Sequence, residues 1–417
     1  MTNFTEMSNR AQAARFALRK CSTDEKNRAL FAVADALVAN TKLIITENAR
    51  DLENGRAKGM HEGLLDRLAL DEDRILAMAE GVRQVANLPD PVGEVIESFT
   101  RPNGLAIRKV RVPMGVIGII YESRPNVTAD AFSLCFKAGN VTVLKGGSDA
   151  ICSNIAIASC IRTALQDNGI TPDALFMIED TDRAVTVELM RQKDWIDVLI
   201  PRGSASLIQS VVANTNIPVI ETGTGNCHIY IDEDADFDMA RPIIINAKTQ
   251  RIGVCNACES LVVHETAAPA FLPLFEADMQ KHHVEIRADE AARKILTGEH
   301  VKPATEEDFG TEYLDYIISV KTVSSLDEAI AHINRYNTGH SDAIITNTES
   351  HAARFLNEID AACVYANAST RFTDGFEFGF GAEIGISTQK LHARGPMGLH
   401  ELTSYKYIIQ GNGQIRG

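Results

Sequence analysis

The spacing of apolar positions divides the start of the chain into two stretches with different predicted structure. The first ninety residues are rich in Ala, Leu, Arg and Glu, and apolar positions recur at helical intervals in segments such as 25–40 and 74–86. Between Pro89 and Pro113 the pattern changes to proline and glycine punctuation around the alternating runs VGEVIESF and LAIRKVRV. We therefore expect several helices followed by a two-stranded hairpin that projects from the main body.

From Val116 onward, short apolar runs alternate with segments of helical length. The expected strands are VIGIIY, VTVL, ALFMI, IDVLI and PVIE, and the expected helices between them cover 127–137, 151–168, 183–191 and 204–214. This order predicts a mostly parallel sheet with helices on both faces. In such a sheet, the loops after the carboxyl ends of the strands build ligand sites.

A second α/β stretch follows. We expect a helix over 237–250, a loop that holds Cys255, the strand ESLVVH and further α/β structure that ends near Ser387. The final run LTSYKYIIQGN alternates like an exposed strand, and it could pair with the 89–113 excursion or with another subunit. At 417 residues the chain exceeds the usual size of a single core, so two or more domains are expected.

Composition and charge narrow the classes of partner and compartment. The 41 Lys plus Arg and 56 Asp plus Glu give a net charge of −15, which repels nucleic acid and anionic lipid alike. An anionic small molecule could still bind where basic residues or helix N-termini reverse the average field. The sequence has neither an apolar run of about 18 residues nor a signal-peptide core. Eight scattered cysteines are typical of a reduced protein, so we expect the cytoplasm.

Two common nucleotide motifs are missing from the sequence. The dinucleotide fingerprint G-x-G-x-x-G is absent, because GTGNCH at Gly223 has the first two glycines only and GFGAEIG spaces its third glycine differently. The sequence also has no G-x-x-x-x-G-K-[ST] loop, which argues against phosphoryl transfer from a bound nucleotide.

Two strand-end loops are candidates for anion binding. YESRPN begins at Tyr121 and LKGGSD begins at Leu144, and each follows an apolar strand and enters a helix. Free N–H groups at the start of a helix point toward such a loop and suit an anion. The alternative is that Gly146 and Gly147 only make a tight turn.

Cys255 is the leading candidate for a chemical thiol. It lies in KTQRIGVCNACES, after Lys248 and Arg251 and with no acidic residue between 247 and 257. Positive neighbours lower the pKa of a thiol and so raise its thiolate fraction. The alternative is a buried cysteine that serves as a small hydrophobic residue.

The other cysteines and histidines favour structural roles. Cys255 and Cys258 match C-x-x-C, which could be a redox dithiol or half of a zinc site. No further ligand pair follows at zinc-site spacing, so we expect no metal and a core position for Cys258. Cys227 and His228 are neighbours on an expected strand, so their side chains point to opposite faces and form no dyad. The histidines that flank NRYNTG are expected to pack or cap rather than act as bases; these are His332 and His340.

Glu221 is the most distinctive acidic residue. It ends the run PVIE and opens the loop TGTGN, where this architecture would place a catalytic carboxylate. The alternative is a solvated glutamate at a strand end.

Taken together, several segments resemble one enzyme family: GVIGIIYESRPNVT, GNVTVLKGGSDA, IETGTGNCHIYID, KTQRIGVCNACE, HINRYNTGHSDAI and EIGISTQKLHARGPMGLHELTSYKY. They are similar to the γ-glutamyl phosphate reductases, within the aldehyde dehydrogenase superfamily, and the resemblance spans nearly the whole chain. It implies an aldehyde-dehydrogenase-like α/β fold with a parallel-sheet cofactor domain over 1–247, interrupted by a flap segment at about 89–113. A catalytic domain would cover 248–395, and a C-terminal oligomerisation strand would cover 396–417.

The resemblance implies NADPH-dependent reduction of L-glutamyl 5-phosphate to L-glutamate 5-semialdehyde, the second step of proline biosynthesis. Cys255 matches the superfamily nucleophile that would form a thioester, and Asn126 of SRPN matches the side-chain donor of the oxyanion hole. Glu221 looks like the residue that activates water in hydrolytic relatives. A hydrolytic aldehyde dehydrogenase is therefore an alternative, and a non-catalytic α/β binding protein is another.

The resemblance also implies cofactor contacts. Lys145 matches the lysine that contacts the adenosine ribose, with Gly146 beside it. Ser148 stands where NAD-preferring relatives often carry an acidic residue, which favours NADPH. Glu312 in GTEYLD looks like the glutamate that orients the nicotinamide ribose, and Gly223 completes the expected contacts.

Charge and loop position suggest Arg124 and Arg251 as partners of the substrate phosphate, with Arg394 in HARGP as a third candidate. The alternative for each is an ordinary salt bridge. The partners that follow are a small-molecule acyl phosphate, further copies of the chain in a homo-oligomer and, as an added candidate, glutamate 5-kinase.

Overall fold

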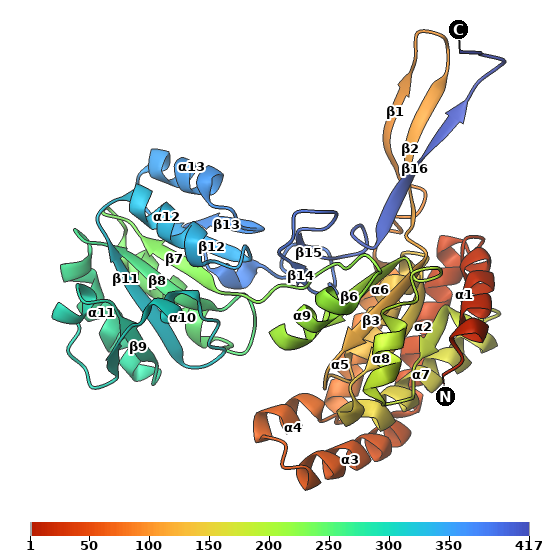
Figure 1. Cartoon of the computed structure of the whole chain (residues 1–417), viewed down its shortest axis with the longest axis horizontal. Helices are drawn as coiled ribbons and strands as arrows, with labels where there is room; N and C mark the ends of the chain where they lie inside the picture. The colour runs from red at the N-terminus through yellow and green to blue at the C-terminus, as the bar shows by residue number, and fades with distance from the viewer. Residues whose placement is uncertain (1, 417) are drawn as a thin grey trace. The chain divides into compact units, whose positions relative to one another are not determined.

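The computed structural model describes residues 2–416, and these fold into two compact units (Figure 1). The first unit comprises the described residues up to Glu221, together with Gly379–Gly385 and those from Met397 on. The second unit comprises Thr222–Phe378 and Ile386–Pro396. The break falls before the boundary expected near residue 247, because strand β7 pairs with strands of the second unit on both sides.

The first unit contains a four-stranded parallel sheet in the order β5-β4-β3-β6, as the alternating pattern predicted. Strands β3 and β4 are buried at every position, as expected for strands covered on both faces. The strands are β3 (Val116–Tyr121), β4 (Val141–Gly146), β5 (Leu175–Met177) and β6 (Val198–Arg202). The helices that connect or follow them are α6 (Val127–Lys137), α7 (Ile151–Asp167), α8 (Arg183–Leu189) and α9 (Ala205–Asn214), with short 3-10 turns η1 (Ser148–Ala150) and η2 (Pro172–Ala174).

The predicted strand PVIE is wrong as a full strand. The segment reaches the sheet through a single bridge between Val219 and Leu199. Its proline, Pro218, has no N–H group to donate and can only accept a hydrogen bond, which it does from the N–H of Leu199. Glu221 therefore follows a short contact with the sheet edge.

The predicted N-terminal helices are confirmed. Helix α2 begins with a capping box in which Ser22 and Glu25 satisfy each other's backbone N–H groups. Its buried face includes Leu30, Val33 and Leu37, at helical spacing. The helices are α1 (Phe4–Leu18), α2 (Thr23–Ala39), α3 (Thr41–Ala57), α4 (Glu62–Leu68) and α5 (Glu72–Asn87).

Within residues 2–416, no single helix has the length and apolar composition needed to cross a membrane. By those two criteria only the pair α2 and α3 would qualify, and only when taken together across the 66° bend between them.

A three-stranded antiparallel sheet projects from the helices of the first unit (Figure 1). It is formed by β1 (Val95–Thr100), β2 (Ala106–Pro113) and β16 (Thr403–Gln410), in the order β1-β2-β16. The predicted pairing of the final strand with the hairpin is confirmed, because β16 pairs with β2 along its whole length.

The second unit is built on a seven-stranded parallel sheet in the order β10-β9-β11-β8-β7-β12-β13. Adjacent residues of β8 point to opposite faces, so Leu261 and Val263 pack with α10 and α11 whereas Val262 packs with α12 and α13. The strands are β7 (Cys227–Ile231), β8 (Cys258–His264), β9 (Glu285–Ala288), β10 (Val301–Pro303), β11 (Ile317–Val323), β12 (Ser341–Ile345) and β13 (Cys363–Ala366). The helices are α10 (Phe237–Thr249), α11 (Ala268–Lys281), α12 (Leu326–Tyr336) and α13 (Glu349–Glu358), with 3-10 turns η3 (Ala292–Lys294), η4 (Glu306–Gly310) and η5 (Thr370–Phe372). A small antiparallel pair, β14 (Ile386–Ser387) and β15 (Gly395–Pro396), completes the unit.

Candidate active site

Cys255 lies in a turn between α10 and β8, and its side chain is half-buried. The expected position in a loop is confirmed, and the thiol is not sealed in the apolar core. Its carbonyl oxygen accepts a hydrogen bond from the Cys227 thiol, with a distance of 3.2 Å between sulfur and oxygen. The backbone of the turn is therefore supported from β7.

Cys258 is a core residue, as predicted. It begins β8, is fully buried and donates from Sγ to the carbonyl oxygen of Ser260 at 3.4 Å. Burial raises the pKa of the Cys258 thiol to about 12, so it stays protonated near neutral pH. Cys255 and Cys258 are both free thiols in this structure. Within residues 2–416, no cluster of three or more His, Cys, Asp or Glu side chains could hold a metal ion.

A glycine packs directly against the Cys255 turn. A Cβ atom on Gly225 would lie 1.5 Å from the carbonyl oxygen of Cys255, so only glycine fits at this position. The N–H of Gly225 donates to Oε1 of Glu312 at 2.6 Å. Burial raises the pKa of the Glu312 carboxyl, and the Gly225 N–H opposes that rise. Glu312, an expected cofactor ligand, therefore supports the Cys255 turn through its hydrogen bond with Gly225.

Gly223 has a packing role in the same loop. Its N–H donates to the carbonyl oxygen of Ile386 at 3.0 Å, and an added Cβ would lie 2.2 Å from Cγ2 of Thr388. The run GTGNCH lacks the third glycine of a dinucleotide fingerprint, and the packing role of Gly225 was not predicted from it. The sequence signal for Gly225 was the pair Gly223 and Gly225, two residues apart, directly before the buried strand β7.

Asn256, the residue after Cys255, is tied to the η5 turn. Its side-chain amide donates to the carbonyl oxygens of Thr373 at 3.0 Å and Arg371 at 3.3 Å. In return, the Thr370 hydroxyl donates to the carbonyl oxygen of Asn256 at 2.8 Å. The turn that carries Cys255 is thus held from both β7 and η5, which brings Arg371 to the site.

The positive charge that Lys248 was expected to provide near Cys255 is paired with a carboxylate. The Lys248 ammonium forms a 2.5 Å ion pair with Glu259, and both side chains are fully buried. Burial raises the pKa of Glu259 to about 7, and the Lys248 charge opposes that rise. Glu259 lies two residues beyond the 247–257 stretch that has no acidic residue, and it compensates the Lys248 charge. Arg251, by contrast, is exposed.

His332 packs against Phe309 and Tyr336, and His340 is fully buried, in line with the predicted packing role. Burial lowers the pKa of His340 to about 4 and that of His332 to about 3, so both stay neutral near pH 7. His228 faces Asp342, with 3.2 Å between Nδ1 and Oδ1, whereas the Cys227 thiol faces His340 at 3.7 Å. Cys227 and His228 therefore have different partners and form no dyad.

Asn126 lies on the loop after β3, directly before α6, and is exposed. Its side-chain amide donates to Oδ2 of Asp130 at 2.9 Å, one turn along the helix. Burial raises the pKa of Asp130 to about 6, while the Asn126 amide and the Arg202 charge oppose the rise. Arg124, on the same loop, is also exposed.

The loops after β3 and β4 are neighbours, because the two strands are parallel and Tyr121 stands opposite Gly146. The Ser123 hydroxyl of the first loop donates to Asp149 of the second at 3.2 Å. Gly146 does not have a positive φ, and a Cβ there would lie 2.2 Å from Nδ2 of Asn154. Packing, and not a left-handed turn, therefore accounts for this glycine.

Lys145 is buried at the carboxyl end of β4, where its ammonium donates to the carbonyl oxygen of Gly146 at 3.2 Å. Burial lowers the pKa of Lys145, and the Asp180 charge opposes that shift. Ser148 is exposed at the start of η1. The first unit thus brings together four expected ligands on adjacent loops: Asn126, Lys145, Gly146 and Ser148.

The loop after β6 was missed in the sequence. The Glu122 carboxylate accepts hydrogen bonds from the Ser204 N–H at 2.7 Å and from its hydroxyl at 3.1 Å. The strand order reverses between β3 and β6, and α/β sheets bind ligands at such a reversal. The signal was the run PRGSA, in which a glycine and the N-cap serine of α9 directly follow an apolar strand.

Arg394 is held in an ion pair. Its guanidinium bonds to Asp360 at 2.7 Å, and Lys390 bonds to the same carboxylate at 2.5 Å. These two cations lower the pKa of Asp360. The structure thus gives Arg394 the partner expected from the salt-bridge alternative.

Glu221 is half-buried at the end of the main segment of the first unit.

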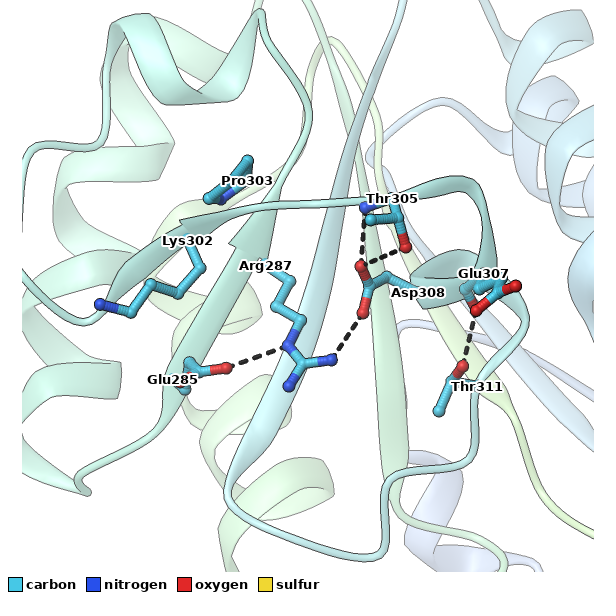
Figure 2. Close-up of a pocket in the computed structure, with 8 residues that line it drawn as sticks. All are labelled: Glu285, Arg287, Lys302, Pro303, Thr305, Glu307, Asp308 and Thr311. Carbon is cyan, nitrogen blue, oxygen red and sulfur yellow. Dashed lines mark hydrogen bonds and ion pairs between the residues drawn. The ribbon is translucent and has the colours of Figure 1, made fainter.

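A pocket on the second unit lies at the β9–β10 edge (Figure 2). Arg287 points between two of its acids and bonds to Asp308 at 2.7 Å and Glu285 at 3.0 Å. No residue predicted from the sequence as a site residue lines this pocket. Arg287 is compensated by these two acids, and we do not assign the pocket to the active site.

The chain belongs to the aldehyde dehydrogenase family, whose family model matches residues 2–296 and 297–408. Within that family it is similar to proteins named gamma-glutamyl phosphate reductase. The relative from Lachnospira eligens is 61% identical over 416 residues, which covers 100% of both chains. The relative from Enterococcus faecalis is 55% identical over 100% of this chain and 99% of its own.

Solved structures agree with this placement. The crystal structure of gamma-glutamyl phosphate reductase from Thermotoga maritima matches with a TM-score of 0.97 and 51% identity, covering 100% of both chains. An acetylating aldehyde dehydrogenase from Geobacillus thermoglucosidasius shares the fold, with a TM-score of 0.69 at 17% identity and coverage of 99% of this chain and 97% of its own. The resemblance and the fold class inferred from the sequence are both confirmed.

Proposed function

We propose that this chain reduces L-glutamyl 5-phosphate to L-glutamate 5-semialdehyde and phosphate with NADPH, the second step of proline biosynthesis. The observation that carries the proposal is the half-buried Cys255 thiol, held in a turn braced by Gly225 and Asn256. The full-length similarity to gamma-glutamyl phosphate reductases supports the same substrate.

The proposed chemistry begins at the Cys255 sulfur. The thiolate attacks the acyl carbon, a carbon–sulfur bond forms, and the carbon–oxygen bond to phosphate breaks to leave a thioester. The N–H of Cys255 and the amide of Asn126 are the proposed donors to the oxyanion that forms during attack. A bound reduced nicotinamide would supply the hydride that lowers the thioester to the aldehyde level. Expulsion of the Cys255 thiolate then releases the aldehyde.

The residues at the end of β4 fit a nicotinamide dinucleotide. Lys145 is buried there, and among residues 2–416 it makes no ion pair, so its ammonium suits the hydroxyls of a ribose. We propose that Lys145 and Gly146 hold the adenosine end, and that Glu312 and Gly223 hold the nicotinamide end.

Ser148 supports NADPH as the preferred cofactor. A carboxylate at this exposed position would repel the 2′-phosphate, whereas a serine does not. We expect kcat/KM to be higher with NADPH than with NADH, and Ser148→Asp to lower the value for NADPH. A clear preference of the unchanged enzyme for NADH would contradict this assignment.

For the substrate phosphate we propose Arg124 and Arg251. Both are exposed on loops that carry other proposed ligands, and Arg251 follows α10 in the Cys255 segment. Arg394 remains a third candidate, less favoured because Asp360 neutralises it. Hydrolysis by Glu221 is not required in this reaction, since the thioester is reduced, and we propose that Glu221 orients groups or relays a proton.

The decisive experiment runs the reaction backwards. With L-glutamate 5-semialdehyde and NADP+, the enzyme should reduce NADP+ only when inorganic phosphate is present, because phosphate must accept the acyl group from Cys255. Phosphate-independent turnover would favour the hydrolytic alternative. Arsenate offers a control, since it should replace phosphate and give continuous turnover.

We further propose that the chain self-associates through the β1-β2-β16 sheet. Three apolar side chains of β16 are more than half exposed there: Tyr405 51%, Tyr407 53% and Ile409 57%. Sedimentation of a Tyr407→Glu, Ile409→Glu double variant should show smaller particles than the unchanged chain. An unchanged sedimentation coefficient would exclude this sheet as the contact.

Two further proposals come from the family resemblance and the cysteine pattern. Association with glutamate 5-kinase can be tested by co-sedimentation of the two purified proteins. The cytoplasm is the proposed compartment, supported by eight cysteines that are all free thiols in the structure.

A further inference from the structure

Arg371 lies beside the Cys255 turn although it is far away in the sequence. Its carbonyl oxygen accepts from the side-chain amide of Asn256 at 3.3 Å, across a separation of 115 residues. Its Nε donates to Oε1 of Gln250 at 3.0 Å, so the guanidinium reaches the end of α10, one residue before Arg251. Hydrogen bonds therefore hold Arg371 at two points: Asn256 holds its backbone, and Gln250 holds its side chain.

The Arg371 charge is not compensated by an ion pair. The guanidinium is half-buried, and within residues 2–416 it forms no salt bridge and its two terminal nitrogens have no hydrogen-bond partner. Burial and the Arg251 charge lower the pKa of Arg371, whereas the charges of Asp374 and Cys255 oppose that shift. The Arg371 guanidinium therefore interacts electrostatically with both Arg251 and the Cys255 sulfur.

Two neighbouring guanidinium groups repel each other, and a bound anion relieves that repulsion. Lys248 and Arg394 illustrate the contrast, because each has a carboxylate within bonding distance. The terminal nitrogens of a guanidinium match phosphate oxygens as a fork. A dianion between Arg251 and Arg371 would satisfy both groups.

We propose that Arg371 binds the phosphate of the acyl phosphate and, with Arg251, holds it while Cys255 attacks. The inference rests on the proposed function, since it assigns a ligand within that reaction. The phosphate leaves from the very carbon that bonds to sulfur, so its ligands must lie close to the Cys255 turn. The carboxylate at the other end of a glutamyl group is several carbons farther from that position.

The reverse reaction tests the assignment. Arg371→Gln should raise the KM for inorganic phosphate by about tenfold or more, as expected for loss of one charge-assisted hydrogen bond. The KM values for semialdehyde and NADP+ should stay within about twofold, since one phosphate ligand serves neither. Arg371→Lys keeps the charge but loses the fork, and its KM for phosphate should lie in between.

Arg293→Gln is the matched control, because Arg293 is exposed on η3 in the same unit and is not part of the proposed site. It should leave the KM for phosphate unchanged. If Arg371→Gln does not fold, Arg371→Lys carries the test through protection of Cys255 by phosphate against alkylation. Weaker protection than in the unchanged enzyme would support the assignment, and equal protection would overturn it.

Other outcomes separate this inference from the proposed function. A folded Arg371→Gln variant with an unchanged KM for phosphate would overturn the inference while the reductase activity stands. A rise in the KM for semialdehyde alone would make Arg371 a ligand of the glutamyl carboxylate, which also overturns it. If the unchanged enzyme shows no dependence on phosphate, both the inference and the proposed function are overturned.

Discussion

The thiol of Cys227 donates a hydrogen bond to the carbonyl oxygen of Cys255, with 3.2 Å between sulfur and oxygen. Burial raises the pKa of Cys227 well above its usual value, so this thiol stays protonated and can donate. The buried Cys227 thereby supports the backbone of the turn that carries the half-buried Cys255.

Replacement of this support should slow the enzyme without abolishing it. Cys227→Ala removes one neutral hydrogen bond, worth about 0.5–1.5 kcal/mol, so we expect kcat to fall by roughly two- to tenfold. Alkylation of Cys255 should still inactivate the variant completely. A Cys227→Ala enzyme with no activity would instead give Cys227 a direct part in the chemistry.

Alkylation should distinguish the two cysteines of the C-x-x-C pair. Cys255→Ala should abolish reduction, because no other thiol can form the thioester. Cys258→Ala should remain active, since Cys258 is buried and hard to ionise. Mass spectrometry after treatment with one equivalent of iodoacetamide should find the label on Cys255, and a label on Cys258 with retained Cys255 would contradict the assignment.

Asn126 is expected to contribute through the transition state. Asn126→Ala removes one proposed oxyanion donor, worth about 3–4 kcal/mol, so turnover should fall by about a hundredfold or more. The KM for the cofactor should change little. Steady-state kinetics check this directly, and normal turnover of the variant would exclude Asn126 from the role.

The Lys248–Glu259 pair should be sensitive to the loss of one partner. Lys248→Met leaves a buried carboxylate uncompensated, which typically costs about 3–5 kcal/mol of stability. The double variant Lys248→Met, Glu259→Leu should recover much of the loss, since a buried pair can often be replaced by apolar residues. Thermal denaturation of the single and double variants is the measurement, and a double variant less stable than Lys248→Met would contradict the reasoning.

His340 should make the folded state sensitive to mild acid. Burial lowers its pKa from 6.5 to about 4, so between these values the unfolded chain binds a proton that the folded chain does not. Stability therefore falls as the pH drops through this window, with a contribution from this group of up to about 1.4 kcal/mol per pH unit. The difference in Tm between pH 7 and pH 5 should be smaller for His340→Gln than for the unchanged chain. An identical difference would mean that His340 titrates with the same pKa in the folded and unfolded chains.

Local patterns predicted the regular elements of the first unit well. The run VIGIIY became β3 and the segment 127–137 became α6, because burial on both faces and helical periodicity are visible within a few residues. PVIE failed as a strand for a local reason, the missing N–H of Pro218. The compact units divide after Glu221, and not near 247, because β7 pairs with β8 and β12, which follow later in the chain.

The residues of the candidate site likewise fall into two groups, those that local motifs reveal and those that depend on contacts between distant parts of the sequence. Cys255, Asn126 and Lys145 were found because they lie in motifs after apolar strands, and the family resemblance gave them roles. Arg371 could not be found, since its contact with Asn256 spans 115 residues. The bond of Glu122 to Ser204 spans 82 residues and was missed for the same reason.

The order in which the chain is synthesised bears on how the first unit is completed. Strand β16 closes the antiparallel sheet against β2, and the Arg111 to Thr403 hydrogen bond joins positions 292 residues apart. During synthesis on the ribosome, the edge of β2 that pairs with β16 therefore stays unpaired until the whole second unit has been synthesised. That edge is exposed to misplaced pairing during translation, so a chain truncated before residue 403 should aggregate even though its Cys255 segment is intact.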